Sequence, residues 1–110
     1  MSTPSEKYQE NLDYLSEYAR DDWVPIHNVF VSASNTIGAG ASLEEITDFT
    51  GTMLRDLFQR GVLLGDLTEH GSGFQPWNGT QDEWLTRVRD DVKARQDIPE
   101  PGELAWMHIP

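Results

Sequence analysis

Helix-start signatures occur at three places in this 110-residue chain, and they constrain its fold more than any other feature. In each, a Thr or Ser is followed three residues later by Glu, so that the two side chains cap each other's backbone N–H groups. The three are Thr3-Pro4-Ser5-Glu6, Ser42-Leu43-Glu44-Glu45 and Thr80-Gln81-Asp82-Glu83. Pro4 strengthens the first, because proline suits the first position of a helix. We therefore predict helices beginning near residues 4, 43 and 81.

Apolar residues recur at helical spacing after each of these starts. The first helix is expected to run to about Arg20, the third to end before Gly61 and the fourth to run to about Arg95. A second helix is predicted to open at Pro25, followed by a loop over Ser34–Ala41. The faces expected to be buried carry Tyr8, Leu12, Leu15 and Ala19; Ile26, Val29, Phe30 and Ala33; Ile46, Met53, Leu54, Leu57 and Phe58; and Trp84, Leu85, Val88 and Val92.

The remaining segments read as strands. Val62–Leu67 is short and apolar, and Phe74–Trp77 follows a turn at Gly71-Ser72-Gly73, which together predict a β-hairpin. Pro76 restricts the returning strand to an edge or an end of the sheet, since proline donates no ladder hydrogen bond. Leu104–Ile109 is apolar on both faces, which predicts a last strand sandwiched between neighbours.

This order of elements predicts an α+β domain with three N-terminal helices, a β-hairpin, a fourth helix and a C-terminal strand in a small antiparallel sheet. No repeat, low-complexity tract or linker divides the chain, so residues 1–110 are expected to form a single domain. Three helices followed by a hairpin is the element order of a winged helix-turn-helix, and we predict a winged-helix-like fold on that analogy.

Four segments of the second half carry a resemblance to known proteins. They are Gly61–Leu67 (GVLLGDL), Gly73–Trp77 (GFQPW), the helix around Trp84 and Pro101–Met107 (PGELAWM). The chain resembles small uncharacterised bacterial proteins in these segments, over roughly residues 50–110. The resemblance implies a winged-helix-like fold and no assigned reaction, and it carries over no functional residue.

The charge balance is strongly acidic. The chain holds 19 acidic and 8 basic residues, which gives a net charge of −11, and it holds no cysteine. The missing cysteines exclude disulfides and thiol chemistry. Met1–Glu10 lacks the pattern of a secretory signal, and no apolar run is long enough to cross a bilayer, so we expect a cytoplasmic protein without a membrane partner. The negative charge repels nucleic acid and favours a basic protein partner.

Few residues combine into a chemical site. His27, His70 and His108 do not pair at metal-ligand spacing, and neither a nucleophile elbow nor a phosphate-binding loop is present. We therefore predict no enzyme, no catalytic residue, no cofactor and no metal. Asp66, Glu69 and His70 cluster at the hairpin, where the two interpretations are a divalent-ion site and an ordinary polar turn.

DNA binding is the main alternative to protein binding. The recognition helix of a winged helix corresponds to the third helix, whose outer face holds more acids than bases. The densest basic run lies in the fourth helix, at Arg87, Arg89, Lys93 and Arg95. Glu83 and Asp91 stand four residues before Arg87 and Arg95, which favours a salt-bridged helix surface over a nucleic-acid patch.

We therefore predict a non-enzymatic acidic binding protein, of the kind that neutralises a basic protein such as a toxin. The candidate binding residues lie on the outer face of the third helix and at the end of the hairpin. The alternatives are a winged-helix transcriptional regulator, a DNA mimic or anti-repressor, and a homo-oligomerisation module. The candidate residues are Glu44, Glu45, Asp48 and Asp56, with Trp77 as a candidate aromatic anchor. For Trp77 the two interpretations are an exposed anchor and a side chain packed where two segments join.

Overall fold

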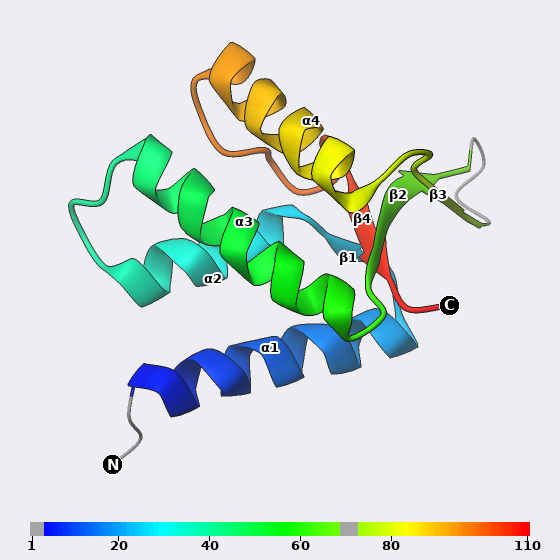
Figure 1. The fold of residues 1–110 in the computed structure, drawn as a ribbon, viewed down its shortest axis with the longest axis horizontal. Coiled ribbons are helices and arrows are strands. Elements are labelled where there is room, and N and C mark those ends of the chain that lie inside the picture. The colour runs from blue at the N-terminus through cyan, green and yellow to red at the C-terminus, as the bar shows by residue number, and fades with distance from the viewer. Residues whose placement is uncertain (1–3, 69–72) are drawn as a thin grey trace.

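The computed structural model describes residues 4–68 and 73–110, which form four helices and four strands (Figure 1). The class is α+β, and the order of the predicted elements is the expected one. The elements are α1 (Pro4–Asp21), β1 (Val24–Pro25), α2 (His27–Ile37), α3 (Leu43–Gln59), β2 (Leu63–Leu67), β3 (Phe74–Pro76), α4 (Gln81–Arg95) and β4 (Trp106–His108).

The capping boxes predicted for α3 and α4 are confirmed. Ser42 Oγ accepts a 3.1 Å hydrogen bond from the Glu45 backbone N–H, and the Glu45 side chain accepts one from the Ser42 N–H. Thr80 and Glu83 make the same reciprocal pair at the start of α4. Gly61 follows the end of α3 at φ +96°, a left-handed conformation that glycine adopts without strain. The predicted cap at Thr3 lies outside the described residues.

The strands form one antiparallel sheet in the order β1-β4-β2-β3. The C-terminal strand β4 lies between β1 and β2, with Met107 opposite both Val24 and Leu64, so the prediction that it is sandwiched is confirmed. The prediction that Pro25 opens a helix is wrong, because Pro25 pairs with Trp106 in β1. The hairpin is confirmed at Gly65↔Pro76 and its neighbouring pairs, while residues 71 and 72 of its turn lie outside the described residues.

Two further boundaries differ from the prediction. The helix α2 continues to Ile37, where the sequence pattern placed a loop from Ser34. Its last turn is supported by a hydrogen bond from the Thr36 hydroxyl to the Ser32 carbonyl, and Asn11 of α1 donates to the same hydroxyl. The last strand is shorter than predicted, because Leu104 has φ +67° and leaves the extended conformation.

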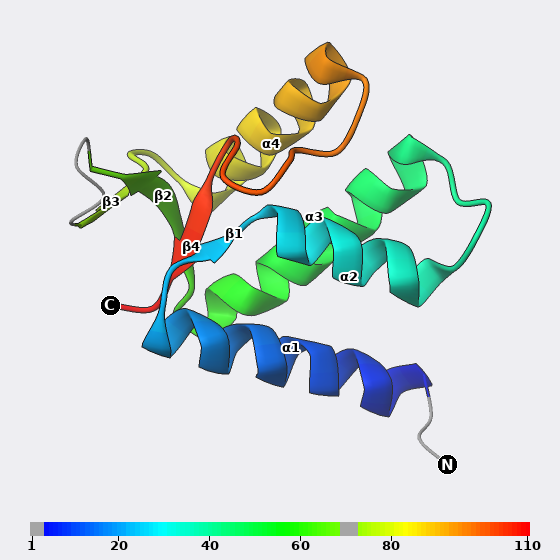
Figure 2. The ribbon, with the colours of Figure 1, turned by 180° about the vertical axis from the view of Figure 1, so that it is seen from behind.

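The helix α3 is central to the helical part of the molecule, since α1, α2 and α4 all contact it. In Figure 1, α1 and α4 lie on opposite sides of α3, and Figure 2 shows α2 covering the face of α3 turned away from the first view. The sheet closes one end of the helices. The core is formed by apolar side chains from the helices and the sheet, including Phe30, Leu54, Leu57, Leu64 and Met107, which are fully buried.

Substitution of Gly65 tests how closely the two strands of the hairpin pack. A Cβ built on Gly65 would lie 2.3 Å from the backbone oxygen of Gln75, so Gly65→Ala must displace a strand. We expect it to lower the free energy of unfolding by about 2–3 kcal/mol in urea denaturation, as overpacking does. Gly51→Ala is the control, because a Cβ at Gly51 of α3 meets nothing within 4 Å. It should raise stability by up to about 1 kcal/mol through helix propensity. Equal effects of the two substitutions would contradict this account of the hairpin.

Candidate functional site

The acidic face predicted on α3 is only partly available to a partner. Glu44, Glu45 and Asp48 are exposed, but Glu45 closes the capping box and Asp48 pairs with Arg89 of α4 at 2.8 Å. Asp56 does not belong to this face. It is half-buried against α1, where its carboxylate accepts a hydrogen bond from the Tyr8 hydroxyl. Of the four predicted carboxylates, Glu44 alone has no side-chain contact to a described residue.

Trp77 is not an exposed anchor, which corrects the prediction. Its side chain retains 6% of its surface, and its indole Nε1 donates to the Asp66 carboxylate at 3.2 Å. The guanidinium of Arg87 lies over the indole ring at 3.8 Å from its centroid, a cation–π contact. The indole therefore sits between a hairpin carboxylate and an α4 cation and holds the hairpin against the helix.

The basic run of α4 is largely engaged within the chain. Arg89 pairs with Asp48, and Arg95 pairs with both Asp91 and Glu103. The i,i+4 pair predicted between Asp91 and Arg95 is thus confirmed. The pair predicted between Glu83 and Arg87 is wrong, because Glu83 caps the helix while Arg87 stacks on the indole. Lys93 is the residue of this run that makes no such contact to a described residue.

The outer face of α1 carries an acidic row that the sequence interpretation missed. Five exposed carboxylates follow one another at intervals of four, three, four and four residues, which places them along one side of the helix. They are Glu6, Glu10, Asp13, Glu17 and Asp21. The signal was present in the sequence, since this row is the complement of the apolar stripe through Leu12 and Leu15.

Tyr14 stands beside this acidic row and, among the described residues, is the most exposed of the large apolar side chains, with 64% of its surface accessible. The ring packs edge-on against Tyr18, with 6.1 Å between the ring centroids. We call Tyr14 and the five carboxylates the α1 acidic face. Asp13 pairs with Arg60 of α3 at 2.6 Å, so the charge of Asp13 is partly neutralised.

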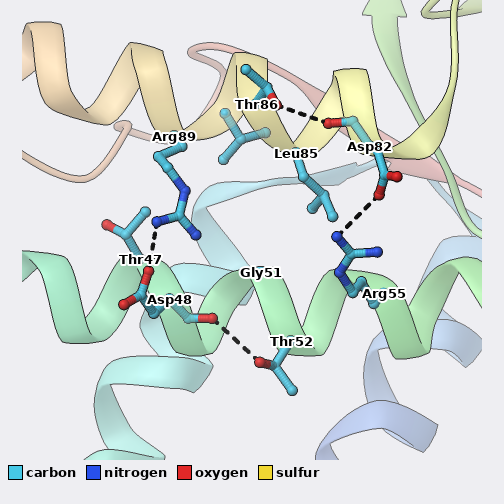
Figure 3. Close-up of a pocket in the computed structure, with 10 residues that line it drawn as sticks. Thr47, Asp48, Gly51, Thr52, Arg55, Asp82, Leu85, Thr86 and Arg89 are labelled. Carbon is cyan, nitrogen blue, oxygen red and sulfur yellow. Dashed lines mark hydrogen bonds and ion pairs between the residues drawn. The ribbon is translucent and has the colours of Figure 1, made fainter.

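A groove of about 420 Å³ separates α3 from α4 (Figure 3). Two ion pairs cross it, Asp48 with Arg89 and Arg55 with Asp82 at 3.0 Å. The four side chains remain 55–78% exposed, so each pair is a weak surface interaction. Gly51 lies between the two pairs in Figure 3, and the space beside it is open.

The perturbed pKa values among the described residues belong to structural contacts. Burial, followed by the hydrogen bond to Asp56, raises the pKa of Tyr8. Hydrogen bonds to Asp91 and Glu103 raise the pKa of Arg95. The backbone hydrogen bond from Glu100, with that from Arg95, lowers the pKa of Glu103. These groups hold elements together and do not converge on one cavity, as the groups of an acid–base site do.

The candidate ion site at the hairpin is only partly described. Glu69 and His70 lie outside the described residues, and Asp66 is engaged by Trp77. Within residues 4–68 and 73–110, no three His, Asp or Glu side chains come close enough to hold a metal ion. His27 Nδ1 contacts the Pro99 carbonyl oxygen at 2.7 Å, which ties the start of α2 to the segment before β4.

Both edges of the sheet resist the addition of another strand. The edge strands are β1 and β3, and each contains a proline, Pro25 and Pro76. A proline on an edge strand offers no N–H to an incoming strand, and natural sheets use it to prevent edge-to-edge pairing. A partner is therefore not expected to bind by adding a strand to this sheet.

The search for related proteins returned nothing similar: no family model, curated protein or solved structure matches this chain. The winged-helix likeness therefore rests on the order of helices and strands alone, and a fold analogy of that kind does not assign a function. Among the described residues, no helix combines the length and the apolar character needed to cross a bilayer.

The Tyr8–Asp56 contact predicts a specific loss of stability in alkali. Unfolded tyrosine deprotonates near its ordinary pKa of 10.0, whereas burial and Asp56 hold the proton on Tyr8 in the folded state. The contribution of protonated Tyr8 to the free energy of unfolding is therefore complete below that pH, and it is lost as the pH rises above about 10. Urea denaturation from pH 8 to about 11 should show a shallower decline for Tyr8→Phe than for the wild type. Tyr14→Phe, at an exposed site, should follow the wild type, and parallel profiles for all three proteins would contradict the prediction.

Proposed function

We propose that this chain is a non-enzymatic binding protein whose partner is a basic protein, and that it acts as an inhibitor or immunity-type protein. The observation that carries the proposal is the α1 acidic face, a continuous row of exposed carboxylates with an exposed tyrosine beside it. The proposal keeps the partner class predicted from the sequence and moves the main contact surface from α3 to α1.

The distribution of cations supports this assignment. Arg55, Arg60, Arg89 and Arg95 are each paired with a carboxylate, and Arg87 stacks on Trp77. Four of the eight basic side chains are therefore offset by paired carboxylates, while the excess of carboxylates gives the net charge of −11. A surface of this kind raises the rate at which a basic protein associates.

Tyr14 supplies the apolar part of the contact. Tyrosine is enriched among the residues that dominate binding energy, because a large ring is buried at little cost in side-chain entropy. A row of carboxylates beside such a ring combines electrostatic steering with an apolar anchor. This is the role that the sequence interpretation gave to Trp77, which is buried.

The charge spacing favours a basic protein surface over mimicry of a DNA duplex. Along α1, the rise of 1.5 Å per residue places successive carboxylates about 5–6 Å apart. Each strand of a DNA duplex carries one charge per about 3.4 Å of the axis, and the second strand adds a further row of charges that α1 lacks. The α1 acidic face therefore fits a partner with a few separated cations better than a DNA-binding groove.

The contacts of α4 argue against the alternative of a DNA-binding regulator. The helix that corresponds to a recognition helix, α3, has α4 packed beside it, and Asp48 and Arg55 of α3 are paired with α4. A helix flanked in this way has little free surface to enter the major groove. Lys93 is left as the free cation of the α4 basic run among the described residues, and one cation gives weak phosphate binding.

The proposal is tested by immobilising the chain and passing cytosol over it at low salt, with and without nuclease treatment. We expect a basic protein to be retained in both cases. Its affinity for Glu10→Lys/Glu17→Lys should then be at least about tenfold weaker than for the wild type, equivalent to about 1.4 kcal/mol, with a flatter salt dependence. Tyr14→Ala should weaken binding through faster dissociation.

Asp90→Lys/Glu100→Lys is the matched control, because it changes the net charge equally at exposed positions away from α1. This variant should bind within a few-fold of the wild type. Equal losses for the two charge-reversed variants would show that only net charge matters and would remove the α1 acidic face from the proposal. Retention of nucleic acid, or of proteins lost after nuclease treatment, would favour the regulator instead.

A further inference from the structure

A short motif occurs twice, once on each helix that lines the groove. On each helix an aspartate is followed four residues later by a threonine and three residues after that by an arginine. Each threonine hydroxyl donates to the carbonyl of its own aspartate, at 3.4 Å on α3 and 3.1 Å on α4. The two copies are Asp48, Thr52 and Arg55 on α3, and Asp82, Thr86 and Arg89 on α4.

The two copies pair reciprocally across the groove. Asp48 of α3 meets Arg89 of α4, and Asp82 of α4 meets Arg55 of α3, which requires the helices to run antiparallel (Figure 3). The two pairs lie seven residues apart along each helix, about 10 Å at 1.5 Å per residue. A local two-fold axis at the centre of the groove therefore relates the motifs. The four charges form a rectangle, about 10 Å along the helices and about 3 Å across the groove, in which neighbouring corners have opposite sign. We call it the charge rectangle.

A rectangle of alternating charges is complementary to a copy of itself. If a second copy is placed face to face by a two-fold rotation about an axis parallel to the helices, α4 of the copy lies over α3. Each aspartate of one charge rectangle then faces an arginine of the other, at all four corners. The intramolecular pairs need not break, because every charge gains a second neighbour of opposite sign.

Gly51 leaves room at the centre of this face. Glycine inside a helix lowers helix stability, and a Cβ at Gly51 meets nothing within 4 Å, so packing within the chain does not require it. The rotation that matches the charges also places the middle of α4 of the second copy, at Leu85 and Thr86, over Gly51. The open space beside Gly51 can accept those side chains, whereas a large residue there would hold the two faces apart.

We propose that the α3–α4 face binds a second copy of this chain and forms a two-fold symmetric dimer. Two adjacent helices of this length, each about 10 Å wide, present roughly 400–500 Å² per copy. The total of roughly 800–1,000 Å² is below the about 1,200 Å² of stable specific interfaces and falls among weak, transient ones, so the dimer is reversible and depends on concentration. The α1 acidic face lies on the other side of α3 and stays exposed in the dimer (Figure 1).

Salt should strengthen this dimer. Each chain carries a net charge of −11, and the charge rectangle itself is neutral, so the long-range force between two copies is repulsive. Raising the salt from about 0.01 M to about 0.15 M shortens the screening length from roughly 30 Å to roughly 8 Å and weakens that repulsion. We expect the dimer fraction in sedimentation velocity to increase over this range. Binding of a basic partner to the α1 acidic face should weaken over the same range.

A fourfold charge reversal tests the proposed contact without changing the net charge. In Asp48→Arg/Arg55→Asp/Asp82→Arg/Arg89→Asp, both intramolecular pairs are kept with inverted signs, so the fold should persist. The variant should dimerise with itself as the wild type does. It should not form mixed dimers with the wild type, because like charges would then meet at all four corners. Free mixing of the two proteins, detected by native mass spectrometry, would overturn the proposal.

Gly51→Leu provides the second test. The side chain enters open space and improves helix propensity, so the melting temperature of the monomer should stay the same or rise. The association constant of the dimer should fall at least about tenfold, since the added side chain separates the two faces. A folded Gly51→Leu variant that dimerises as the wild type does would overturn the proposal, and so would a wild-type protein that stays monomeric at every concentration and salt.

Discussion

The burial of α3 is the constraint on which the rest of the structure depends. All three other helices pack against it, yet its sequence is a poor helix former, with three threonines and a glycine between residues 47 and 52. The threonine hydroxyls reduce the conflict by donating to carbonyls four residues earlier, as Thr47 does to Leu43 and Thr50 to Ile46. The helix then depends on its capping box and on the apolar residues beneath it, because propensity alone does not hold it.

The elements that sequence analysis predicted well are those whose cause lies within a few residues. The Ser42 and Thr80 caps, the glycine that ends α3 and the hairpin strands are all local patterns, and each occupies its expected place. Pro25 was misassigned because its conformation is determined by a partner, Trp106, that lies about eighty residues away. A single proline before an apolar periodic run predicts a helix start equally well. Only the pairing of Pro25 with β4 decides between a strand and a helix start at this position.

The candidate site likewise contains some features that follow from local sequence patterns and others that depend on contacts between distant segments. The acidic row on α1 can be predicted from the sequence, since it is the complement of the apolar stripe. The sequence interpretation instead assigned the contact surface to α3, because α3 also has an excess of acidic residues. The pairing of Asp48 with Arg89, and of Asp56 with Tyr8, joins segments more than forty residues apart and cannot be inferred from spacing. The same is true of Trp77, whose burial depends on Arg87 and Asp66 arriving from two other elements.

These contacts separate the surface into two regions with different electrostatics. Around the α3–α4 groove, cations and carboxylates alternate and neutralise each other, so attraction there acts only at contact distance. On α1 the carboxylates exceed the cations, and their field extends over a Debye length. The prolines in both edge strands oppose association by strand addition. Because α3 lies between α1 and α4, a contact on one face leaves the other accessible, and a dimer joined through α3 and α4 presents two acidic faces to a basic partner.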